Sequence, residues 1–293
     1  MTSSWLSQGY RTQLEDEKAS PGNQAGLFFF LTYVVTWASW LGAWAISDGG
    51  FARAGLWMLP FYLGVFAPGF VAVWLTFRGE GSAGVRALLS RLVQWEAGIR
   101  WYVFALTYMA AIKLAAALIH RLATGEWPLF GNEPLYLMLA ATLGSMVVFG
   151  QSGEEVGWRG YALPRLAGRI GLGRASIVVG IMWASWHLPL FFVPGTGTTG
   201  QSFPIYMLGV IAISVAIAWL YQRTNGSLFL TMLMHSAINN TKDIVPSVGP
   251  VPTNPFAISA TLIGWLTAGL MWLCAAYLLF RMKQKTAPDE GRE

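Results

Sequence analysis

Long hydrophobic runs recur along this chain of 293 residues, and they constrain its fold more than any other feature. Only 11% of the residues are charged, against about 25% in soluble domains, so a water-solvated surface cannot be built from them. A helix needs about 20 apolar residues to cross a bilayer. We therefore predict an all-α, polytopic membrane protein with about eight transmembrane helices. They lie at about 27–46, 55–77, 101–120, 134–150, 175–193, 203–222, 227–244 and 256–280.

The 19 Lys and Arg residues predict how these helices are oriented, because cytoplasmic loops carry the excess of positive charge. Fifteen of the 19 fall in the two tails and in the connections after the second, fourth and sixth runs, with Arg159 and Arg165 counted in the fourth connection. The other side has Arg53, Arg121 and Lys242, while Lys113 lies inside the third run. We expect both termini in the cytoplasm and the protein in the cell membrane.

The same pattern divides the chain into a polar tail at 1–25, a transmembrane domain at 26–282 and a second polar tail at 283–293. Between the second and third runs, apolar residues at helical spacing predict a short helix on the membrane surface. These residues are Val85, Leu88, Leu89, Leu92 and Val93.

Several classes of protein are excluded. Cys274 is the only cysteine, so neither an intramolecular disulfide nor a cysteine zinc site can form. The net charge of +5 comes from basic residues between hydrophobic runs, which form no patch for nucleic acid. The partner that the composition predicts is the lipid bilayer, and nothing in the sequence indicates an oligomeric state.

Ionisable groups near the end of the fourth run are unexpected in a membrane and therefore suggest function. In a helix, Glu155 and Arg159 are four residues apart and can pair. Glu154 then points about 100° away and has no local counter-ion. Such a carboxylate can exchange protons near neutral pH. A solvated helix end at the interface is the alternative interpretation.

Two further polar groups lie in the fifth and seventh runs. His187 follows Trp183 by one helical turn, and the nearby Pro189 can open a local cavity. His235 and Asn239 are also one turn apart and face the same side of one helix. Each group alone is explained equally well by packing or by hydrogen bonds between helices.

Together these residues supply what is needed to activate a water and stabilise an oxyanion inside a membrane. Serine catalysis fits poorly, because Ser152, Ser185 and Ser236 have no Gly-x-Ser-x-Gly turn and no aspartate to orient a base. The His-Glu-x-x-His motif of common zinc proteases is absent from the sequence.

At these positions the sequence resembles the CPBP intramembrane proteases, the CAAX-protease and bacteriocin-processing family that includes Rce1-type and Abi proteins. Three motifs carry the resemblance within about 150–240: Glu154-Glu155-x-x-x-Arg159, an aromatic-x-x-x-His at Trp183 to His187, and His235-x-x-x-Asn239. The second motif usually begins with Phe and here begins with Trp183. Three motifs in order, each at a membrane span, form a specific signal.

The resemblance implies an endopeptidase that cleaves a membrane-associated peptide, prenylated or carrying a leader, inside a conical cavity. Glu154 would activate water, and His187 would position that water or shuttle its proton. His235 and Asn239 would form the oxyanion hole, with Glu155 and Arg159 as an orienting pair. No cofactor is required in this interpretation.

Three alternatives stay open. Glu154, His187 and His235 could instead hold a divalent metal such as zinc. The chain could be a non-catalytic scaffold or immunity protein that retains the motifs. A proton-coupled transporter with Glu154 as relay is a third hypothesis, although no internal repeat supports it.

Overall fold

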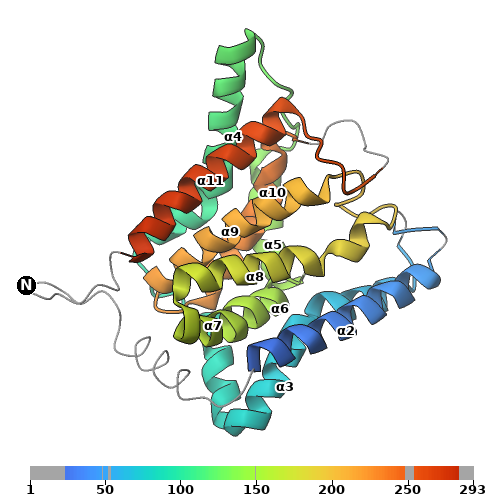
Figure 1. Cartoon of the computed structure of the whole chain (residues 1–293), viewed down its shortest axis with the longest axis vertical. Helices are drawn as coiled ribbons and strands as arrows, with labels where there is room; N and C mark the ends of the chain where they lie inside the picture. The colour runs from blue at the N-terminus through green and yellow to red at the C-terminus, as the bar shows by residue number, and fades with distance from the viewer. Residues whose placement is uncertain (1–23, 48, 52–53, 149, 248–253, 284–293) are drawn as a thin grey trace, which may run out of the picture.

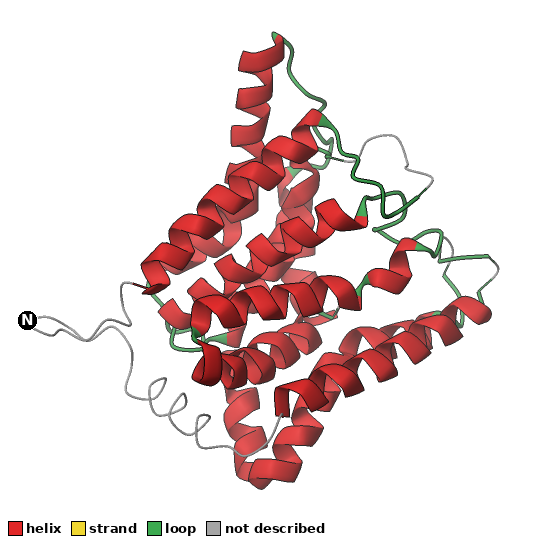
Figure 2. Ribbon diagram, viewed as in Figure 1, coloured by secondary structure: helices red, strands yellow, loops and turns green. Residues whose placement is uncertain are grey.

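The computed structural model describes residues 24–47, 49–51, 54–148, 150–247 and 254–283. These ranges contain helices and no strand (Figure 2), which confirms the predicted all-α fold. Residues 1–23 and 284–293 of the predicted tails lie outside them, as does Arg53. The helices are α2 Gln24–Ala45, α3 Met58–Ser90, η1 Arg91–Val93, α4 Ile99–Thr124, α5 Leu135–Val148, α6 Gln151–Glu155, η2 Val156–Ala162, α7 Leu163–Ile170, α8 Leu172–Trp186, η3 Leu188–Phe191, α9 Phe203–Arg223, α10 Leu228–Thr241, η4 Lys242–Ile244 and α11 Leu262–Lys283.

Each of the eight hydrophobic runs coincides with a helix, but the helices differ in length. Helices α2, α3, α4, α9 and α11 are long and apolar enough to cross a membrane, and α5 with α6–α7 would form a sixth span bent by 55°. Helices α8 and α10 have 15 and 14 residues. At 1.5 Å per residue they reach only about 20 Å, short of the roughly 30 Å hydrocarbon core. The polytopic architecture is confirmed, and the count of eight crossings stays a prediction.

The connection after α5 is not the solvated loop that the charge count assumed. It continues as α6, η2 and α7, whose residues are mostly buried. Arg159 is fully buried, so counting it as a cytoplasmic loop cation was wrong. Arg165 is nearly buried and pairs with Glu80 at 2.6 Å. These cations lie inside the bundle because a carboxylate there neutralises each of them.

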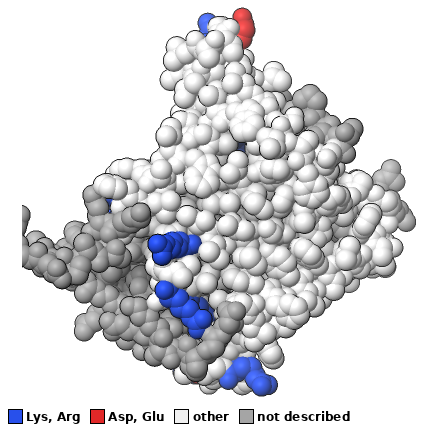
Figure 3. All heavy atoms as spheres, in the orientation of Figure 1, with Lys and Arg blue, Asp and Glu red and all other residues white. Residues whose placement is uncertain are grey.

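The face seen in Figure 3 still shows an uneven distribution of charge. Lys and Arg side chains gather mainly toward the end of the molecule where the chain termini lie in Figure 1. This agrees with the direction of the predicted asymmetry. The compartment that each end faces remains a prediction.

The bend between α3 and the short amphipathic helix lies at Gly81, whose φ of 66° favours glycine. The helical segment after Gly81 ends at Ser90. This agrees with the prediction of a separate short helix there. Its position at a membrane surface stays a prediction.

Close packing places η2 at the centre of the bundle. A Cβ atom on Gly157 would lie 2.8 Å from the backbone carbonyl of Pro68, so glycine permits η2 to approach α3. Trp158 is fully buried, with its ring 5.8 Å from the ring of Trp186 in an edge-to-face contact. Helices α8 and α10 thus pack around a central segment that directly follows the acidic pair at the end of α6.

Candidate active site

A cavity of about 540 Å³ lies between α4, α6, α8, α9, α10 and α11. Four of the six predicted site residues line it, namely Glu154, His187, His235 and Asn239. Glu155 and Arg159 lie behind its wall and are fully buried. Three segments far apart in the sequence therefore bring their polar groups to one enclosed space, as the motif order suggested.

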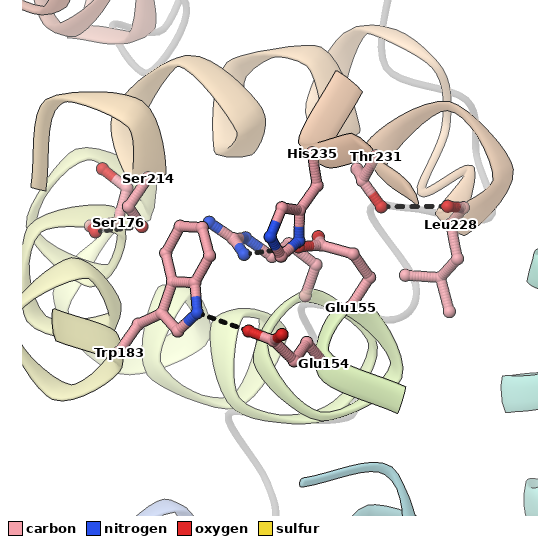
Figure 4. Close-up of polar contacts among 9 residues, drawn as sticks. Glu154, Glu155, Ser176, Trp183, Ser214, Leu228, Thr231 and His235 are labelled. Carbon is pink, nitrogen blue, oxygen red and sulfur yellow. Dashed lines mark hydrogen bonds and ion pairs between the residues drawn. The ribbon is translucent and has the colours of Figure 1, made fainter. Parts of the chain in front are cut away.

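Glu154 stands on the cavity wall at the end of α6 and is 6% exposed. Its Oε2 accepts a hydrogen bond of 2.7 Å from the indole Nε1 of Trp183 (Figure 4). Among the described residues Glu154 makes no ion pair, as predicted. One carboxylate oxygen is thus held by an indole, and the other is left for a molecule in the cavity.

Glu155 makes the ion pair that its spacing predicted. Its Oε1 accepts from Arg159 Nη1 at 2.7 Å and lies 3.0 Å from His235 Nδ1. Both bonds converge on one oxygen atom, so the position of the His235 ring depends on the Glu155–Arg159 pair. The neighbouring carboxylates Glu154 and Glu155 therefore have different surroundings, one facing the cavity and one neutralised.

The segment after Glu155 is wound as a π-helix over Val156–Ala162, where the sequence predicted an ordinary helical pairing. A π-helix hydrogen-bonds each residue to one five positions away, and such segments are rare and occur mainly at functional sites. Single-sequence periodicity gives no signal for such winding. Here the π-helix directly follows the two carboxylates and contains Arg159.

His187 lies between the last residue of α8, Trp186, and the short 3-10 helix η3, which begins at Leu188 and contains Pro189. Its Nδ1 lies 2.9 Å from the carbonyl oxygen of Trp183. Because a carbonyl can only accept, Nδ1 carries the proton, and the neutral ring then has its lone pair on Nε2. No described residue binds Nε2. His187 is therefore oriented to accept a proton from the cavity.

His235 and Asn239 lie one turn apart on α10, and both line the cavity as their spacing predicted. His235 is 4% exposed and donates from Nδ1 to Glu155, which leaves its Nε2 for the cavity. Asn239 is exposed, with no described hydrogen-bond partner for its side chain. The Asn239 amide can therefore donate to a developing negative charge, whereas His235 Nε2 can do so only when both ring nitrogens carry a proton.

Trp183 contacts all three motifs, which the sequence did not predict. Besides its bond to Glu154, its ring lies 4.9 Å from the His235 ring and 4.4 Å below the Arg159 guanidinium. Its carbonyl orients His187. Trp183 stands where the motif usually has Phe, and the difference is more than one of size. The indole has an N–H group, which phenylalanine lacks, and this group donates a hydrogen bond to the Glu154 carboxylate.

Replacing Trp183 with Phe should lower kcat about tenfold or more while the protein stays folded. A hydrogen bond to a charged group contributes about 1.5–3 kcal/mol, and its loss frees Glu154 to adopt other rotamers. Trp186→Phe is the matched control, because that indole donates a 2.8 Å bond to Thr36 instead. Equal kcat values in steady-state peptide cleavage by the two variants would contradict this role.

The alternative metal set of Glu154, His187 and His235 stays a hypothesis, and Trp183 binds one of the two Glu154 carboxylate oxygens. Within the described ranges, no group of three or more His, Cys, Asp or Glu side chains is placed to hold a metal ion. We therefore derive no catalytic step through a metal.

A buried carboxylate, two imidazoles and an amide around a cavity are the groups that an intramembrane hydrolase would need. Comparison with known proteins supports this class. Residues 134–241 match the family model of Rce1-like type II CAAX prenyl endopeptidases. The chain is also 26% identical over 238 residues to CAAX prenyl protease 2 of Methanococcus maripaludis, covering 75% of this chain and 84% of the relative.

Both matches are to CAAX prenyl endopeptidases, and they support the family that the motifs resemble. The matched segment begins one residue before α5 and ends with α10, so it includes α6, the π-helix, α8 and α10. All three motifs lie within it. This confirms the resemblance that the motifs suggested.

Proposed function

We propose that this enzyme hydrolyses a peptide bond of a membrane-associated peptide by direct activation of water, with no metal required. The observation that carries the proposal is the shared cavity wall of Glu154, His187, His235 and Asn239. A prenylated C-terminal peptide is the first substrate to test, because the matched family and the relative are both named as CAAX prenyl proteases. Leader peptides are the second.

In the proposed reaction, Glu154 takes a proton from the water as its oxygen attacks the carbonyl carbon. The lone pair on His187 Nε2 holds the water in line for attack. The negative charge on the carbonyl oxygen is stabilised by the Asn239 amide and by His235, whose Nε2 donates when both ring nitrogens carry a proton. The C–N bond then breaks, and Glu154 returns the proton to the leaving amine.

Glu155 and Arg159 would act through His235. The carboxylate orients the imidazole, while Arg159 neutralises the buried carboxylate. Two observations support these roles. Glu155 and Arg159 are both fully buried, and the bonds from Arg159 and from His235 meet at the same Glu155 oxygen, Oε1.

His187→Ala should reduce kcat at least about a hundredfold, the usual contribution of a positioned acid or base. The matched control is His120→Ala, a half-buried histidine of α4 whose ring makes hydrogen bonds only to the Glu126 backbone and to Thr124. Cleavage of a farnesylated C-a-a-X peptide by detergent-solubilised protein is the measurement. Similar kcat values for the two variants would remove His187 from the mechanism.

The same assay tests the metal hypothesis. Activity should survive prolonged incubation with a chelator, and purified active protein should contain less than stoichiometric zinc. Loss of activity on chelation with recovery on adding zinc would instead support Glu154, His187 and His235 as ligands in a rearranged site.

A further inference from the structure

Lys113 is a buried cation that the proposed mechanism does not use. It lies in the middle of α4 and is 3% exposed. Its Nζ donates to the carbonyl oxygen of Val245 at 2.9 Å and to the hydroxyl of Ser247. The side chain lines the same cavity as Glu154. An ammonium group is thus fixed on the wall of the active-site cavity.

This cation has no carboxylate partner among the described residues. The ion pairs there involve Glu80 and Glu155 only, and the exposed Asp243, which also lines the cavity, interacts with Lys113 electrostatically without forming an ion pair. An ammonium group has three N–H donors, and two neutral acceptors bind two of them. A charge at membrane depth is costly unless it is paired or faces a wet cavity. Lys113 is therefore suited to bind an anion.

The position of Lys113 matches the length of a short peptide. His235 and Lys242 are seven residues apart along α10 and its extension η4, which corresponds to roughly 10 Å. Val245 and Ser247, which hold the Lys113 ammonium, follow directly after η4. Three extended residues also span roughly 10 Å. A peptide cleaved near His235 would thus place an anion about three residues further on beside Lys113.

We propose that Lys113 binds the free C-terminal carboxylate of the substrate and thereby selects bonds about three residues from a chain end. The inference rests on the proposed endopeptidase function. In a C-a-a-X terminus the carboxylate lies three residues beyond the modified cysteine. A charge-assisted bond to a carboxylate is stronger than one to a neutral amide, so the lysine distinguishes a true chain end from an internal or blocked one.

The test compares two farnesylated C-a-a-X peptides that differ only in a free carboxylate or a carboxamide at the C-terminus. Wild-type protein should cleave the acid with a kcat/KM about tenfold or more above the amide. Lys113→Met should cleave both at similar, low efficiency, and Lys113→Arg should restore part of the preference. Arg121→Met, an exposed cation on the same helix, should keep the full preference.

The outcomes separate this inference from the proposed function. Equal cleavage of both peptides by wild-type protein overturns the carboxylate site but leaves the endopeptidase function intact. If Lys113→Met lowers kcat/KM for the acid and the amide by the same factor, the role of Lys113 is only structural, to bind Val245 and Ser247 to α4. The inference is then wrong. Failure of wild-type protein to cleave either peptide overturns the proposed prenyl-peptide substrate and this inference with it.

Discussion

Glu154→Gln should abolish peptide cleavage while leaving the protein folded. The amide keeps the volume of the side chain and can still accept from Trp183 Nε1 through its oxygen. It cannot accept a proton from water, so the reaction loses its base. General-base catalysis contributes about 10²–10⁴ to the rate, or roughly 3–5 kcal/mol of transition-state stabilisation.

The measurement is single-turnover cleavage by detergent-solubilised protein, with thermal unfolding recorded in parallel. Glu126→Gln is the control, an exposed carboxyl beyond the end of α4. A scaffold or immunity protein would keep its cellular effect in Glu154→Gln, and a protease would lose it. Cleavage by the variant at more than a tenth of the wild-type rate would exclude Glu154 as the base.

Arg159→Met should cause the largest loss of stability of any single change in the site. The Glu155–Arg159 pair is fully buried, and removing the cation leaves a carboxylate in the interior with only His235 beside it. Breaking a buried pair in this way costs about 3–5 kcal/mol. The Arg159 guanidinium also stacks on Trp183, and that contact is lost as well.

The double variant Glu155→Gln with Arg159→Met tests whether the cost comes from the unpaired charge. It should be more stable than Arg159→Met alone, with a coupling energy of about 1–3 kcal/mol. Arg165→Met is the control, because its partner Glu80 is 50% exposed and solvent can replace the lost bond. Thermal unfolding in detergent measures these proteins together with Glu155→Gln, the single variant that completes the double-mutant cycle.

The activity of that double variant distinguishes an orienting pair from a packing element. If the pair orients His235, the folded double variant still cleaves slowly, because the imidazole loses the carboxylate that fixes its Nδ1. Wild-type cleavage by a folded double variant would show that the pair serves packing alone.

The sequence predicts the helices well because each hydrophobic run is long and the lipid permits only helices or closed barrels. It also predicts the pairing of Glu155 with Arg159, which depends only on local spacing. The burial of Arg159 could not be predicted in this way. A polar stretch between hydrophobic runs is typical of a loop, and only the packing of η2 against α3, α8 and α10 shows that it is internal.

Trp183 and Lys113 show the same limit for side chains. Both were noted in the sequence, one as an unusual aromatic residue and one as a charge inside a run. Their contacts with Glu154 and with Val245 join residues 29 and 132 positions apart. Such contacts depend on how the helices cross, which the hydrophobic pattern of one sequence does not determine. The departure from Phe at position 183 was the one available signal.

The cavity is lined by residues of the connections at 197–202, 242–247 and 259–261, toward the end of the bundle opposite the last residues of α11 (Figure 1). If both termini are cytoplasmic, as the charge distribution predicts, this end of the bundle would face the other compartment. A substrate would then present its cleavage site from the outer leaflet, and the short fragment would be released outside the cytoplasm. The protease would in that case act after its substrate had been translocated.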